Sequence, residues 1–192
     1  MHALPAAPAP PPRRQVLVGT ALAGVATVML IGAMLAVWIL QRERAIDADG
    51  TWLPAGTSIP EVPVNVMLIG VWTLCVFAQW AVYAARRGDK AHTALALGLV
   101  GLITLALINA QAYVYDQMDL AIAETGYAGM FYGITGVMVA LFLVGLVFSA
   151  IAAFRFLGGR TDDHEIVAAH ALFWYVLAAV FSAIWLIVYV TK

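Results

Sequence analysis

Long apolar runs separated by short polar segments make up most of this chain. Five of them contain no Asp, Glu, Lys or Arg and lie near residues 16–40, 63–85, 92–115, 128–154 and 166–190. A helix rises about 1.5 Å per residue, so each run is long enough to cross a hydrocarbon core about 30 Å thick. Because lipid leaves backbone groups without partners, each run must satisfy its own hydrogen bonds. The pattern predicts an all-α membrane protein, a five-helix transmembrane bundle.

Composition supports this fold class and excludes others. Hydrophobic residues make up 64% of the 192 residues, charged residues 11%, and the mean hydropathy is +0.92, all unlike a soluble domain. The net charge is −1 and no Lys/Arg run exceeds a pair, so nucleic acid is not an expected partner. The single cysteine, Cys75, excludes an intrachain disulfide and a Cys-rich metal site.

The chain divides into a tail and one membrane domain. Residues 1–14 are rich in Ala and Pro and have no periodic apolar face, which predicts a disordered tail. Residues 15–192 form the predicted five-helix transmembrane domain. Its connections include a polar loop at 41–62, a tight turn at 86–90 and an acidic loop after the third run.

The distribution of basic residues predicts the orientation. Seven of them fall on one side of the predicted bundle, namely Arg13, Arg14, Arg86, Arg87, Lys90, Arg155 and Arg160. Three, Arg42, Arg44 and Lys192, fall on the other. Basic residues concentrate in cytoplasmic loops, so the N-terminus is expected inside and, after five crossings, the C-terminus outside.

No catalytic, cofactor-binding or metal site is predicted within this chain. There is no Gly-rich phosphate loop, HExxH, GxSxG or CxxC motif. His92 and His170 begin the third and fifth runs near the same membrane face, so a shared metal site is one hypothesis. The favoured alternative is two interfacial polar side chains at helix ends.

Small and polar residues inside the runs indicate helix contacts. Thr104 and Gln111 lie on one face of the third run and can act as interhelical hydrogen-bonding groups or line a path. Gly129, Gly133 and Gly136 follow the small-xxx-small spacing that lets helices approach closely. With Trp174 in the last run, these six residues are the candidate helix-packing or partner-interface positions.

Several motifs resemble subunit III of the haem-copper cytochrome c oxidases. Residues 51–56 (TWLPAG) and 59–65 (IPEVPVN) are similar to that family's Trp-Pro-Pro-x-Gly stretch and the Pro and Asn that lead into a helix. Gln111-Ala112 with Tyr115 resembles its Gln-Ala-x-Glu-Tyr motif, with Val114 in place of the Glu. Residues 126–136 resemble its Tyr-Gly-Ser-x-Phe-Phe-x-x-Thr-Gly segment, and Phe173-Trp174 with Trp185 and Tyr189 resembles its aromatic last helix. The chain is identified as a divergent five-helix member.

The resemblance implies an accessory subunit without a cofactor of its own, a multi-pass protein of a cell membrane, here the bacterial plasma membrane. It would pack beside other subunits of a haem-copper terminal oxidase, including subunit I, which holds the haem and copper. It would also bind lipids. It would support aerobic respiratory electron transport and proton translocation. Two alternatives stay open at this point: an accessory subunit of a nitric oxide reductase, and a small oligomeric transporter or channel lined by Thr104 and Gln111.

Overall fold

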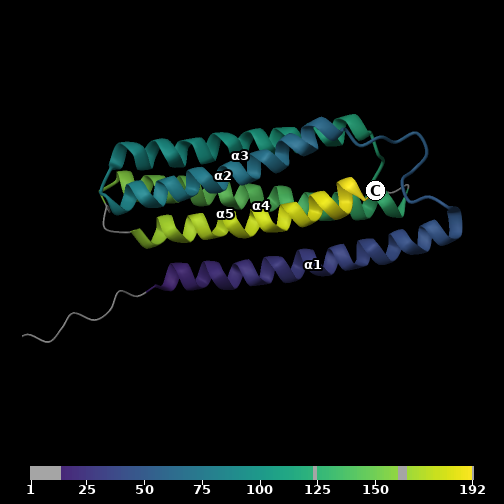
Figure 1. Cartoon of the computed structure of the whole chain (residues 1–192), viewed down its shortest axis with the longest axis horizontal. Coiled ribbons are helices and arrows are strands. Elements are labelled where there is room, and N and C mark those ends of the chain that lie inside the picture. Colours follow the sequence, from purple (N-terminus) through teal and green to yellow (C-terminus); the bar gives the residue numbers. More distant parts are fainter. Residues whose placement is uncertain (1–13, 123–124, 160–163, 192) are drawn as a thin grey trace, which may run out of the picture.

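Five long helices, seen side by side in Figure 1, account for nearly all of the described chain. The computed structural model describes residues 14–122, 125–159 and 164–191, and the predicted tail falls outside this part except for Arg14. The helices are α1 (Gln15–Asp49), α2 (Glu61–Arg86), α3 (Lys90–Met118), α4 (Gly126–Leu157) and α5 (His164–Ile184), which continues as a π-helical segment, η1 (Trp185–Val190). All five are long and apolar enough to span a membrane, which confirms the predicted fold class.

The first helix is longer than the apolar run that predicted it. Residues 41–49, expected in a loop, continue α1 as helix. This segment carries charges but consists mainly of good helix formers, and hydropathy cannot detect such an extension. The helix ends at Gly50, whose left-handed backbone (φ 73°) lets its N–H donate to the Ile46 carbonyl.

Local signals set the starts of α2, α3 and α4. Pro60 precedes α2 and Pro63 lies in its first turn, where a missing N–H costs nothing. The Asp89 side chain accepts a bond from the His92 N–H at the start of α3, and Thr125 accepts one from the Ala128 N–H at the start of α4. These caps hold the polar connections at the ends of the bundle.

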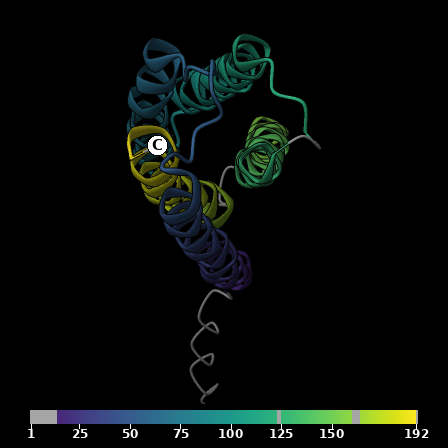
Figure 2. The same cartoon turned by 90° about the vertical axis from the view of Figure 1, so that its right-hand side faces the viewer.

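The helices α2, α3, α4 and α5 form a four-helix bundle, with α1 added on one side. Each of these four packs against two of the others, in the cyclic order α2, α3, α4, α5. Helix α1 packs mainly along α5 and makes only a few contacts with α4 and η1. The end-on view in Figure 2 shows α1 beside α5 and away from α3.

The two ends of the bundle differ in charge. One end, here called the basic end, carries Arg14, Arg86, Arg87, Lys90 and Arg155. The opposite end holds the start of α2, the loop before it and the described C-terminus (Figure 1). That the basic end faces the cytoplasm stays a prediction.

Candidate functional site

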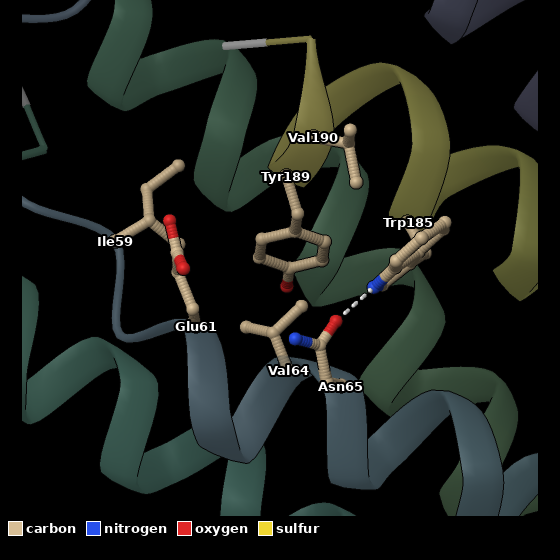
Figure 3. Close-up of a pocket in the computed structure, with 7 residues that line it drawn as sticks. All are labelled: Ile59, Glu61, Val64, Asn65, Trp185, Tyr189 and Val190. Carbon is tan, nitrogen blue, oxygen red and sulfur yellow. Dashed lines mark hydrogen bonds between the residues drawn. The ribbon is translucent and has the colours of Figure 1, made fainter.

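A cleft opens at the opposite end of the bundle, between the start of α2 and the π-helical end of α5 (Figure 3). It encloses about 250 Å³ and is lined mainly by apolar side chains together with Glu61 and Asn65. The Trp185 indole closes one side by donating a hydrogen bond to Asn65 Oδ1 (3.0 Å). Apart from the Glu61 carboxylate, the Asn65 amide and the polar tips of Trp185 and Tyr189, the lining is apolar. The cleft is therefore suited to holding an apolar group.

Tyr189, which lines the cleft, ties the end of α5 to α3. Its hydroxyl donates to Gln111 Oε1 (2.9 Å), and both side chains are buried. Thr104, two turns earlier on α3, donates to the carbonyl of Val100 in its own helix (2.7 Å) and is also buried. Gln111 therefore bonds across helices, as polar side chains of membrane helices commonly do, whereas Thr104 bonds its own backbone.

Trp174 belongs to a buried polar network that joins α4 to α5. Its indole N–H donates to His170 Nε2 (2.9 Å), and Ser149 Oγ lies 2.7 Å from the same nitrogen. Because an indole N–H can only donate, Nε2 of His170 must accept, and the proton of this neutral imidazole is on Nδ1. His170 is fully buried, unlike the interfacial side chain expected at this helix end.

Helix α4 lies in tight contact with α5 at Gly145. A Cβ atom there would lie 2.7 Å from two ring carbons of Trp174 and 2.8 Å from Phe173, so only glycine fits. The three glycines singled out in the sequence are less crowded. A Cβ at Gly133 would meet Met34 of α1 at 3.7 Å, one at Gly129 would meet the Ile122 carbonyl at 3.9 Å, and one at Gly136 would meet nothing within 4 Å.

Sequence reasoning missed His170, Ser149 and Gly145 as parts of one network. A partial signal existed, because Gly145 and Ser149 are four residues apart, as are His170 and Trp174, so each pair shares a helix face. What the sequence could not supply was the register of α4 against α5, which brings the two pairs together.

Comparison with known proteins identifies the family. The family model described as cytochrome c oxidase subunit III matches residues 16–192. This chain belongs to the cytochrome c oxidase subunit III family. The resemblance noted in the sequence is thereby confirmed.

Individual relatives agree at low identity. Cytochrome c oxidase subunit 3 of Danio rerio is 27% identical over 150 residues, and that of Drosophila yakuba is 25% identical over 150 residues. A bacterial relative, the probable cytochrome c oxidase subunit 3 of Rickettsia bellii, is 23% identical over 167 residues. These alignments cover 76%, 77% and 83% of this chain, respectively, but only 56 to 57% of the relatives. The chain thus spans little more than half the length of the relatives it matches.

His92 and His170, the two histidines of the metal-site hypothesis, are both engaged with other groups of this subunit III family member. His170 Nε2 is already engaged by Trp174 and Ser149 within the core. His92 is exposed at the start of α3, where its Nδ1 lies 2.6 Å from Asp89 Oδ2, and its ring packs against Trp80. In the described ranges no three His, Cys, Asp or Glu side chains come together as a metal-binding group.

Proposed function

We propose that this chain is an accessory subunit of a haem-copper terminal oxidase of the cytochrome c oxidase type. It packs beside subunit I, which holds the haem and copper, and beside other subunits of the complex, and it binds membrane lipids on its outer faces. Its part in respiratory electron transport and proton translocation is to support the catalytic subunit. The observation that carries this proposal is the family match over residues 16–192.

The character of the bundle supports a structural role. Several buried polar side chains bond one another or their own backbone, as Gln111, Ser149 and Thr104 do. The outer surfaces of the helices are largely apolar, with side chains such as Phe154 and Val62 about three-quarters exposed. Such surfaces pack against lipid or against other membrane helices, in agreement with a subunit that surrounds a reaction centre located in another polypeptide.

Gentle solubilisation of the full chain with an affinity tag tests this proposal. We expect a haem-bearing membrane polypeptide to copurify and to supply the Soret absorption of the preparation. After separation in a harsher detergent, the tagged chain should keep no Soret band and the haem should follow the other polypeptide. Purification without any haem protein, or haem that stays with the isolated chain, would contradict the proposal.

Lipid binding, the other part of the proposal, is tested by a separate measurement. Phospholipid extracted from the purified complex should fall in amount when apolar lining of the cleft in Figure 3 is replaced by a bulky polar group, as in Val64→Gln. The matched control is Val66→Gln, on the exposed side of the same helix turn. Equal lipid content in both variants would argue against lipid binding in this cleft.

A further inference from the structure

Three hydrogen bonds join outward-facing side chains of α2 to α5 and its continuation η1 at three different depths. Trp185 Nε1 donates to Asn65 Oδ1 (3.0 Å), Trp72 Nε1 donates to Ser182 Oγ (3.1 Å), and Tyr175 Oη donates to Gln79 Oε1 (2.7 Å). These six side chains are here called the polar ladder. Its α2 members are exposed and recur every seventh residue, which is about two helical turns, so they follow one face of the helix.

The ladder extends deep into the membrane span. The 26 residues of α2 cover about 39 Å. Trp72 lies near the middle of this length. Gln79 precedes the terminal Arg86 by seven residues, or about 10 Å, and so lies within the hydrocarbon layer. Polar side chains at this depth are ordinarily turned toward the interior of a membrane protein, away from lipid.

The two amides of the ladder keep unused donors. Asn65 and Gln79 each accept one bond through the side-chain oxygen, and their NH₂ groups donate to nothing in the part of the chain that the structure describes. Lipid tails have no acceptors, so a donor left there is energetically costly. The acceptor oxygens of lipids lie at the headgroups, too far away for the Gln79 amide. A protein group at the same depth can satisfy it.

The surface along the ladder is also hollowed. A shallow depression of about 350 Å³ is lined by Trp72, Val76, Gln79 and Tyr175, together with Cys75. The cleft of Figure 3 includes the Asn65–Trp185 pair at the other end of the ladder. Hollows between ridges on a helix pair accept the side chains of a third helix. The face thus combines spare donors with a shape suited to helix packing.

We infer that the polar ladder is a docking surface for a transmembrane helix of the catalytic partner, and that this helix presents acceptor oxygens to the NH₂ groups of Gln79 and Asn65. The inference rests on the proposed function for the identity of the partner, because the family is that of an oxidase subunit. Beyond the proposed function, it specifies which face of this chain meets that partner. It also specifies the groups that the partner's helix must offer, namely Ser, Thr, Asn or Gln side chains or a free backbone carbonyl.

The first test separates the ladder's outward donors from its internal bonds. Gln79→Leu removes the donors, whereas Tyr175→Phe removes only the bond between α5 and Gln79 and leaves the NH₂ group in place. Each variant is co-expressed with differently tagged wild-type chain, and the share of each in the haem-bearing complex is measured. An interhelical hydrogen bond in a membrane contributes about a threefold change in association, rising to roughly 20-fold in strong cases. We expect Gln79→Leu to lose occupancy by that factor and Tyr175→Phe to keep nearly all of it.

An amide elsewhere supplies the matched control. Gln117 is exposed next to the last residue of α3, a helix that does not belong to the ladder, and at this end of the helix its donors can reach headgroups and water. Gln117→Leu should compete with wild-type chain equally well. Equal losses for Gln79→Leu and Tyr175→Phe would mean that the ladder acts only within this chain, and equal losses for Gln79→Leu and Gln117→Leu would mean that this face has no special part. Either result would overturn the inference.

Cross-linking identifies the occupant directly. A photoreactive benzoylphenylalanine in place of Val76, between Trp72 and Gln79, is compared with one in place of Leu102 on α3; these positions are 66% and 63% exposed. In the purified complex we expect position 76, and not position 102, to link to a transmembrane helix of the haem-bearing subunit. Links from position 76 only to lipid, or to a second copy of this chain, would overturn the inference even where the haem protein copurifies. A link to a haem-free subunit of the same complex would also overturn the inference, although it would agree with the proposed function, which fails only if no haem protein copurifies or if the haem stays with this chain.

Discussion

Helices α1 and α5 lie side by side, but they are buried to very different extents. Of the 35 residues of α1 only Gly24, Ile31, Leu35 and Trp38 are buried, whereas eleven of the 21 residues of α5 are. Helix α5 contacts α1, α2 and α4, and α1 is held mainly along one stripe. The four-helix bundle therefore carries the core of the fold, and α1 is a peripheral addition to it.

Helix α1 is fixed at two places by different chemistry. At the basic end its Leu17 N–H, one of the unpaired donors of a first helical turn, donates to Glu165 Oε1 of α5 (3.0 Å). Toward the other end of its apolar run, the ring of Trp38 lies 5.3 Å from Trp52 and 5.2 Å from Tyr127 between ring centroids. Between these attachments, α1 presents side chains such as Leu22 and Met29 that are about two-thirds exposed. The comparison predicts that core variants weaken the whole bundle while α1 variants release one helix.

The largest effect is expected from Trp174→Ala in α5. The change empties a fully buried site, removes the ring contacts with Phe142 and Phe173, and takes away the donor to His170. Such truncations cost about 3–5 kcal/mol. The free energy of unfolding, measured by denaturant titration in mixed micelles, should fall by about that amount.

Trp38→Ala is the comparison in α1, and it should instead increase proteolysis of the 51–60 loop. An equal loss of global stability from both would break the distinction between α1 and the bundle.

A smaller effect is expected from Gly145→Ala. The new methyl group would meet the Trp174 ring at 2.7 Å, and strained overpacking of this kind costs about 1–3 kcal/mol. Gly136→Ala on the same helix meets nothing within 4 Å and should be neutral or stabilising by about 0.5–1 kcal/mol through helix propensity. Thermal midpoints of both variants in detergent check this, and a midpoint for Gly145→Ala at or above wild type would exclude the tight contact.

A local effect is expected where α1 meets α5. A Cβ at Gly24 would approach Val176 Cγ2 to 3.0 Å, so Gly24→Leu should push α1 away at a cost of about 1–2 kcal/mol. Gly19→Leu, with open space around it, is the matched control. Hydrogen exchange should become faster in α1 of the first variant only, with α2 to α5 unchanged. Faster exchange throughout would mean that α1 is an integral part of the core.

The comparison also explains which parts of the structure could be predicted from the sequence. The five helices follow from the solvent, because an uncharged apolar run in lipid has to close its own backbone hydrogen bonds. The difference in burial between α1 and α5 could not be predicted in this way, because residues that face lipid are as apolar as residues that face the core. The runs at 16–40 and 166–190 are accordingly similar in hydrophobicity. Hydropathy locates helices in a membrane but leaves their neighbours unspecified.

The polar contacts could not be predicted for the same reason, because they depend on which helices are neighbours and on their register. Gln111 was recognised as a packing candidate, yet its partner Tyr189 is 78 residues away. His170, 21 residues from Ser149, was expected at the surface because it begins an apolar run, and the packing of α4 on α5 buries it. Individual polar residues can be picked from a sequence, but their pairing requires the helix register.

The smallest effect concerns the turn between α2 and α3, outside the membrane spans. The His92 backbone N–H and, next, the His92 side chain hydrogen-bond the Asp89 carboxylate and lower its pKa below the ordinary 3.8. A carboxyl whose pKa is lower in the folded state stabilises the fold above its unfolded pKa and loses that contribution as the pH falls through the lowered value. Amide exchange at His92 and Thr93 should therefore accelerate, relative to the intrinsic exchange rate at each pH, only on acidification below about pH 4. Asp89→Asn retains an N-cap oxygen and should remove this pH dependence, and the same acid-induced acceleration in that variant would exclude Asp89 as its source.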